Sequence, residues 1–189
     1  MSHRSAVHEL KTLVLSFHSL LTIETVEEER VRSLLIEVAN DLRLPFYEWS
    51  VTEGLRRLRG ATMDMTQDAL MALKNIDRFD FDAIYLFKDL APHLSNANIA
   101  RALRELAQKL VSTRSMIVLT GSPIELPSDL DALAVRFELQ LPDEQELREL
   151  IRSVIDSITA RQPVRVDLSR EDAQRLVRSL SGLTLNQAR

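Results

Sequence analysis

The stretch that decides the fold runs from Leu20 to Leu42 and reads LLTIETVEEERVRSLLIEVANDL. It begins with a short apolar run, Leu20 to Ile23, which has the length and composition of a buried strand. A polar turn follows, in which Thr25 precedes Glu28 by three residues, the spacing of a capping box at a helix start. Apolar residues then recur at helical spacing, at Val31, Leu34, Leu35, Val38 and Leu42. The stretch therefore predicts a strand, a tight turn and an amphipathic helix.

The composition is that of a globular protein of one domain, or of one domain with a small appendage. The chain has 189 residues, 45% of them hydrophobic and 28% charged. It has no cysteine, which excludes disulfides and thiolate metal sites. No apolar run approaches bilayer length and the N-terminus lacks a signal-peptide core, so we expect a cytoplasmic protein without a membrane partner. The formal net charge of −4 argues against nucleic acid as a partner.

Strands and helices alternate along the first 142 residues. Besides the strand already described, strands are predicted at 46–51, 81–87, 116–120 and 133–141, and helices at 7–17, 66–75 and 95–110. This alternation indicates βαβ units and a mostly parallel sheet. We predict an α/β fold with a five-stranded sheet between two helical layers.

Beyond Pro142 the pattern contains helices only. Asp143 precedes Glu146 at capping-box spacing, a second helix begins near Ser169, and Thr184 can cap a further turn. An isolated helical turn is not stable by itself, because nucleation is costly. We therefore expect a chain that continues beyond its last residue.

These patterns predict two domains, an α/β core at 1–142 and a small helical lid at 143–189 that is truncated at its C-terminus. Several segments, in their order and spacing, carry a resemblance to a known family: 25–30 (TVEEER), 46–55 (FYEWSVTEGL), 86–89 (LFKD), 117–119 (IVL), 139–142 (LQLP) and 167–188. The chain resembles the N-terminal module of a family of AAA ATPases found in cyanobacteria, plastids and other bacteria. In that family the first module has lost its phosphate loop, and a downstream module keeps it.

The resemblance implies an AAA-like (P-loop NTPase-like) fold. It also implies that the parent protein binds ATP and magnesium, hydrolyses ATP and forms homo-oligomers. For this segment it implies a non-catalytic role, in which it assembles or regulates the downstream ATPase module of the same chain.

The junction where a phosphate loop would lie has the wrong residues for one. A Walker A loop needs glycines, a lysine and a hydroxyl that binds magnesium. Positions 22–32 contain neither glycine nor lysine, and Thr25, Glu27, Glu28 and Glu29 stand there instead. Each carboxylate repels a phosphate by about 1–4 kcal/mol at close range, whereas a helix N-terminus favours an anion by only about 0.3–1 kcal/mol. We therefore predict no catalytic residue, no bound cofactor and no ATP turnover in this segment.

The strand at 81–87 is followed by Lys88 and Asp89, where an active family member would carry two acidic residues for magnesium and water. We interpret both as surface or capping residues at a strand end; the alternative is a residual magnesium role for Asp89. Thr120 stands at the end of another strand, where we interpret it as a strand-end polar residue. No histidine has metal-ligand spacing, so no metal site is predicted.

The segment 55–61 is interpreted as a basic, solvated connection, with anion binding by Arg56, Arg57 and Arg59 as the alternative. A competing function remains open. The chain would then be an α/β small-ligand- or nucleotide-binding domain that uses the carboxyl edge of its sheet. Its candidate contacts are Glu27, Asp89, Thr120 and the three arginines.

Overall fold

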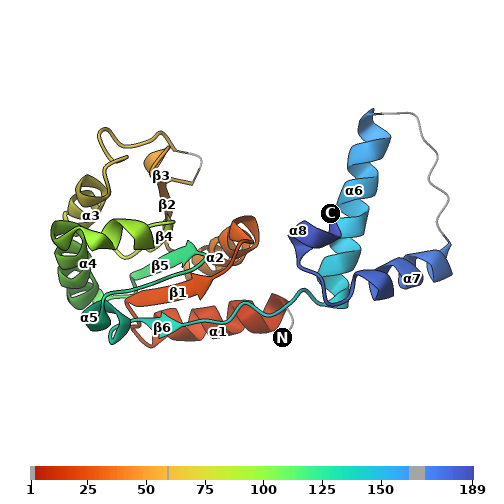
Figure 1. Ribbon diagram of the computed structural model, residues 1–189, viewed down its shortest axis with the longest axis horizontal. Helices are drawn as coiled ribbons and strands as arrows, with labels where there is room; N and C mark the ends of the chain where they lie inside the picture. The colour runs from red at the N-terminus through yellow and green to blue at the C-terminus, as the bar shows by residue number, and fades with distance from the viewer. Residues whose placement is uncertain (1–2, 59, 162–168) are drawn as a thin grey trace. The chain divides into compact units, whose positions relative to one another are not determined.

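The computed structural model describes residues 3–58, 60–161 and 169–189 (Figure 1). The chain forms two compact units, each described by itself. The larger is Val7–Leu139, and the smaller combines Met1–Ala6 with Gln140–Arg189. The division predicted at residue 142 did not anticipate that the N-terminal residues group with the smaller unit. That residues 143–189 act as a lid stays a prediction.

The larger unit is built on one six-stranded sheet with the order β3-β2-β4-β5-β1-β6 (Figure 1). Neighbouring strands are parallel except for β2 and β3. The bounds are β1 (Leu20–Glu24), β2 (Phe46–Ser50), β3 (Gly54–Arg57), β4 (Ile84–Lys88), β5 (Met116–Gly121) and β6 (Val135–Arg136). The α/β class and the mostly parallel sheet are confirmed, and the expected number of five strands is wrong.

The additional strand, β3, lies where a connection was predicted. Gly54 has a φ of +75°, a conformation that glycine adopts at little cost, and it turns the chain back antiparallel to β2. Leu55 N–H donates to Thr66 Oγ1 at 2.8 Å, and Glu48 faces Arg56 across the two strands. The segment predicted as a basic connection therefore begins with a strand of a hairpin, and the pairing of Arg56 with Glu48 across the two strands stabilises it.

Helices cover both faces of the sheet, which gives the three predicted layers. On one face of the sheet, strand residues such as Trp49 and Phe87 share one apolar cluster with α3 (Ala69–Asp77) and α4 (Ala97–Leu110). The strand residues that alternate with these, such as Leu86, point to the other face and are also fully buried. The helix α2 (Glu28–Leu42) packs on β2 and β4. The remaining elements are α1 (His3–Leu15), the 3-10 helix η1 (Ala91–Ser95) and α5 (Ser128–Asp131).

Four predicted helix starts differ from those in the structure, and two of them are α1, which begins at His3 instead of residue 7, and α3, which begins at Ala69 instead of residue 66. The Thr25–Glu28 capping box does not form: α2 begins at Glu28, and Thr25 Oγ1 accepts from Glu27 N–H at 3.0 Å. Thr25 N–H donates to Gly121 O at 3.0 Å, which keeps Thr25 in line with β1 and outside the helix. The helix expected from residue 95 begins at 97, where Asn96 caps it after η1.

The smaller unit contains α6 (Glu144–Arg161), α7 (Arg170–Leu180) and α8 (Leu185–Ala188). Its helices begin at the predicted caps. Asp143 and Glu146 each accept the backbone N–H of the other, at 2.9 and 3.1 Å, and Ser169 and Thr184 cap the other two helices. Within the described ranges, no helix has both the length and the apolar character needed to cross a bilayer.

Candidate functional site

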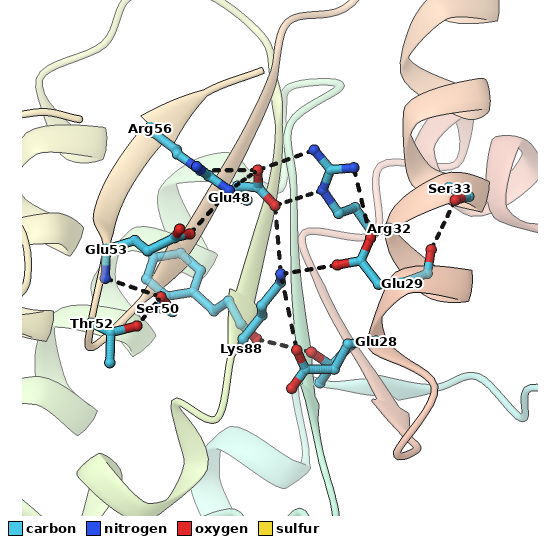
Figure 2. Close-up of polar contacts among 12 residues, drawn as sticks. Glu28, Glu29, Arg32, Ser33, Glu48, Ser50, Thr52, Glu53, Arg56 and Lys88 are labelled. Carbon is cyan, nitrogen blue, oxygen red and sulfur yellow. Dashed lines mark hydrogen bonds and ion pairs between the residues drawn. The ribbon is translucent and has the colours of Figure 1, made fainter. Parts of the chain in front are cut away.

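Six charged residues of the larger unit converge where β1 meets α2 and where β2, β3 and β4 lie beside it (Figure 2). Three come from the first turns of α2 and one from each of the three strands. We call them the charge cluster: Glu28, Glu29, Arg32, Glu48, Arg56 and Lys88.

Glu48 is the most buried member, with 4% of its side chain exposed. Arg32 Nε donates to its carboxylate at 2.8 Å and Arg32 Nη2 at 3.3 Å, while Arg56 Nε donates at 3.1 Å. Burial by itself would raise the pKa of Glu48. The Arg32 hydrogen bond and the charges of Arg32, Arg56 and Lys88 outweigh burial and lower this pKa. Glu48 is therefore held as a carboxylate by two guanidinium groups from different elements.

Lys88 lies among three carboxylates. Its Nζ is 3.7 Å from Glu48, 3.8 Å from Glu29 and 3.9 Å from Glu28, and 16% of its side chain is exposed. These separations are charge–charge contacts longer than ordinary hydrogen bonds. We interpreted Lys88 as a surface or capping residue at a strand end; it does end β4, and in addition its half-buried ammonium group lies against the start of α2.

The other residues at the predicted phosphate-loop position are already engaged within the chain. Glu27 is buried and pairs with Arg30 at 3.2 Å, and Thr25 accepts from the backbone as described. Glu28 and Glu29 are turned toward Lys88 (Figure 2). The structure thus joins two groups that the sequence presented separately, the acids at 27–29 and the lysine at 88.

Asp89 and Thr120 lie at the carboxyl ends of β4 and β5. Asp89 is exposed, with a φ of +52°, and its N–H donates to Thr120 O at 2.8 Å. Thr120 is itself buried, and its hydroxyl lies 3.5 Å from Phe87 O. Its interpretation as a strand-end polar residue agrees with this position.

The three candidate anion-binding arginines do not converge. Arg56 belongs to the charge cluster and also pairs with Glu53 at 3.0 Å. Arg57 is exposed and adjacent to Arg56 on β3, where successive side chains point to opposite faces. Arg59 lies outside the described residues. A cavity of about 450 Å³ is lined by Arg32 and Arg56, but both guanidinium groups are bound to Glu48.

A groove of about 590 Å³ lies at the carboxyl edge of β4 and β5, lined by segments that follow these strands. Asp89 lines this groove, and it is one of the candidate contacts for the competing ligand-binding function. Three other candidates, Glu27, Thr120 and Arg56, do not line the groove. In the described part of the chain no group of histidine, aspartate and glutamate side chains is arranged to hold a metal ion.

The two residues at the centre of the cluster, Arg32 and Glu48, were not predicted from the sequence. A signal for Glu48 was present, since it stands between Tyr47 and Trp49 in a strand predicted to be buried. A carboxylate at such a position requires a cationic partner. Its partner Arg32 could not be identified, because it lies 16 residues away on α2.

Sequence comparison identifies relatives along the whole chain. Residues 6–139 match the model of the SpoVK-like AAA ATPase N-terminal domain, and residues 145–189 match the second domain of the same family. The AAA domain-containing protein ycf46 of Trieres chinensis is 25% identical over 184 residues, covering 96% of this chain and 36% of that protein. Its counterpart in Guillardia theta is also 25% identical, over 98% of this chain and 36% of that protein. The chain thus spans about a third of the length of these relatives.

Solved structures share the fold at low sequence identity. The FIGL-1 AAA domain in complex with ADP superposes with a TM-score of 0.69 at 14% identity, covering 98% of this chain and 66% of that one. A katanin structure, described as the basis of katanin self-assembly, gives a TM-score of 0.64 at 12% identity, covering 96% and 64%. The AAA-like fold is therefore confirmed. Because the N-terminal domain model matches most of the chain, the chain belongs to the SpoVK-like AAA ATPase family.

Proposed function

We propose that this chain is a non-catalytic AAA module that assembles with, or regulates, a downstream ATPase module of the same polypeptide. One observation carries the proposal: Lys88, at the end of β4, lies within 4 Å of Glu28 and Glu29 at the start of α2. In a nucleotide-binding member the helix start attracts phosphate and the strand end carries the acids that hold magnesium. In this chain the helix start carries the negative charges of Glu28 and Glu29, and the strand end carries the positive charge of Lys88.

The exchanged charges oppose a bound MgATP at both ends. A triphosphate at the start of α2 would meet the carboxylates of Glu28 and Glu29, each of which repels it by about 1–4 kcal/mol. A magnesium ion near the end of β4 would meet the ammonium group of Lys88. The residues at this junction therefore do not fit MgATP, and no hydrolytic step is assigned to them.

The ion pairs also replace a function that a nucleotide serves in other domains. A bound ligand stabilises a fold by contacting several elements at once. The charge cluster joins α2, β2, β3 and β4 through contacts within the chain. The module is thereby held in an AAA-like conformation, suited to packing against other AAA modules, without a cofactor.

The relatives support a longer parent protein. The two ycf46 proteins are almost three times as long as the matched segment, and the katanin structure concerns self-assembly. We propose that the parent binds ATP and magnesium through its downstream module, that residues 143–189 serve as the lid of this one, and that the parent forms homo-oligomers.

Calorimetry tests the missing nucleotide site. MgATP and MgADP are titrated into the 189-residue chain, and the expected result is no binding heat at micromolar concentrations. A micromolar dissociation constant that is lost in Glu28→Lys would overturn the proposal. The unrelated exposed residue Glu9 supplies the control variant, Glu9→Gln.

Deletion tests the regulatory role. Removing residues 1–189 from the parent should change its ATPase rate, its oligomer size, or both. If the truncated and the intact parent have the same rate and the same size by light scattering, the module neither assembles nor regulates the ATPase.

The competing function, a ligand site at the carboxyl edge of the sheet, keeps one supporting observation, the groove beside Asp89. Its lining contains no cationic residue among those described, so a phosphate-bearing ligand does not suit it. The groove is better explained by a ligand of the opposite charge.

A further inference from the structure

The groove at the carboxyl edge combines apolar walls with free carboxylates. It has a volume of about 590 Å³ and is bordered by the segments after β4 and β5. Leu94, Leu126 and Pro127 contribute apolar surface, and Asp89 and Glu125 contribute acidic groups. Open α/β sheets place ligands outside the carboxyl ends of their strands, and this groove occupies that position in the larger unit.

The two acids have no partners within the described part of the chain. Neither carboxylate makes a hydrogen bond or an ion pair, and both side chains are exposed. The Asp89 carboxylate lies over Gly121, where an added Cβ would come to 3.0 Å from Asp89 Oδ1.

We propose that this groove docks a segment of a partner protein that inserts an arginine side chain. An arginine has an apolar stem that suits the leucine and proline walls, and a cationic head that suits the carboxylates. An apolar ligand would leave two carboxylates without water or a partner, which is costly. A phosphate would be repelled by both. This proposal goes beyond the proposed function and is independent of whether the chain binds ATP.

The test uses the 189-residue chain and two nine-residue peptides of glycine, alanine and serine. One carries a central arginine and the other a central citrulline, which has the same shape without the charge. Binding is followed by ¹H–¹⁵N NMR titration. The arginine peptide should shift the amides of residues 89–91, 93–95, 122 and 124–126, which leaves out the three prolines of the groove, and the citrulline peptide should bind about tenfold more weakly or not at all.

Two variants locate the contact. Asp89→Asn and Glu125→Gln should each weaken the arginine peptide about tenfold, the loss expected for a charge-assisted hydrogen bond. Asparagine tolerates the left-handed conformation of residue 89, so this variant keeps the fold. Glu9→Gln, which removes an exposed acid on α1, should leave binding unchanged.

Three results would overturn the proposal. Equal shifts with the arginine and citrulline peptides would show that charge does not matter. Binding of free spermidine as tight as that of the peptide would show a site for small cations. Self-association of the chain that is abolished by Asp89→Asn would show that a second copy occupies the groove.

Discussion

Lys88 Nζ lies 3.7 Å from the buried carboxylate of Glu48 and 3.8 Å from that of Glu29, so one ammonium group faces acids from two elements. Glu29 is on α2 and Glu48 on β2, while Lys88 ends β4. The contact therefore ties the helix that follows the first strand to β4, in the middle of the sheet.

Replacing Lys88 with methionine should destabilise the larger unit. Methionine keeps the length of the side chain but removes the ammonium charge that lies within 4 Å of Glu28, Glu29 and Glu48, while Arg32 and Arg56 still bind Glu48. We expect a loss of about 1–3 kcal/mol in the free energy of unfolding. Urea denaturation measures it through the fluorescence of Trp49, the only tryptophan, which is 1% exposed.

The matched control for that variant is Lys74→Met, since Lys74 is exposed on α3 and has no ion-pair partner in the described residues. It should change stability by less than about 0.5 kcal/mol. Equal stability of Lys88→Met and the unmodified chain would mean that the lysine does not balance the acids.

Glu48→Gln should remove a pH-dependent part of the stability. The folded-state pKa of Glu48 is lowered, mainly because the Arg32 hydrogen bond and the neighbouring cations outweigh burial. Its contribution is therefore fully present above the ordinary glutamate pKa, and it is lost as the pH falls through the lower folded-state pKa. We expect the variant to be about 1–3 kcal/mol less stable at pH 7.

Denaturation curves from pH 7 down to pH 3 test this sign. The difference between Glu48→Gln and the unmodified chain should be constant between pH 6 and 8 and should shrink below about pH 4. A difference that grows on acidification would mean that the folded-state pKa of Glu48 is raised and that the arginines do not hold it.

Gly54→Ala should disrupt the β2–β3 hairpin. The position has a φ of +75°, and a Cβ there would come to 2.7 Å from Thr66 Oγ1, the acceptor of the Leu55 N–H bond. Backbone strain alone costs about 1 kcal/mol, and the close contact adds to it. Thermal unfolding of the larger unit, followed by Trp49 fluorescence, should show the combined loss.

Gly182→Ala separates the cost of backbone strain from the cost of the close contact with Thr66. Gly182 has a φ of +92°, and an added Cβ would meet nothing within 4 Å. Its cost should therefore be the backbone strain alone, measured by amide exchange in α7 and α8. If Gly54→Ala costs no more than Gly182→Ala, the contact with Thr66 is relieved by a small movement.

Asp143→Ala should fray the start of α6. Asp143 Oδ1 accepts from the N–H groups of Gln145 and Glu146, and these bonds, the Glu146 bond foremost, lower the pKa of Asp143. Loss of an aspartate cap costs about 0.5–2 kcal/mol. Hydrogen exchange at residues 145 and 146 should quicken. Asp156→Ala, in the exposed interior of α6, should leave their exchange unchanged.

Local patterns were sufficient for much of the fold. The apolar face of α2 and the caps at Asp143, Ser169 and Thr184 lie where the sequence placed them, because periodicity and capping act within one or two helical turns. The Thr25 cap was wrong for a tertiary reason, since the backbone of Thr25 bonds to Gly121 on the neighbouring strand.

By itself the sequence determined the α/β class, most of the strands and the absence of glycine and lysine between positions 22 and 32. Only the tertiary structure decided that Glu28 and Glu29 face Lys88, that Arg32 and Arg56 meet on Glu48, and that residues 54–57 form a strand. The physical reason is the range of the interactions. Hydrophobic periodicity and capping act between near neighbours in the chain, whereas the ion pairs depend on which strands lie side by side, and strand order is set by the packing of the whole sheet.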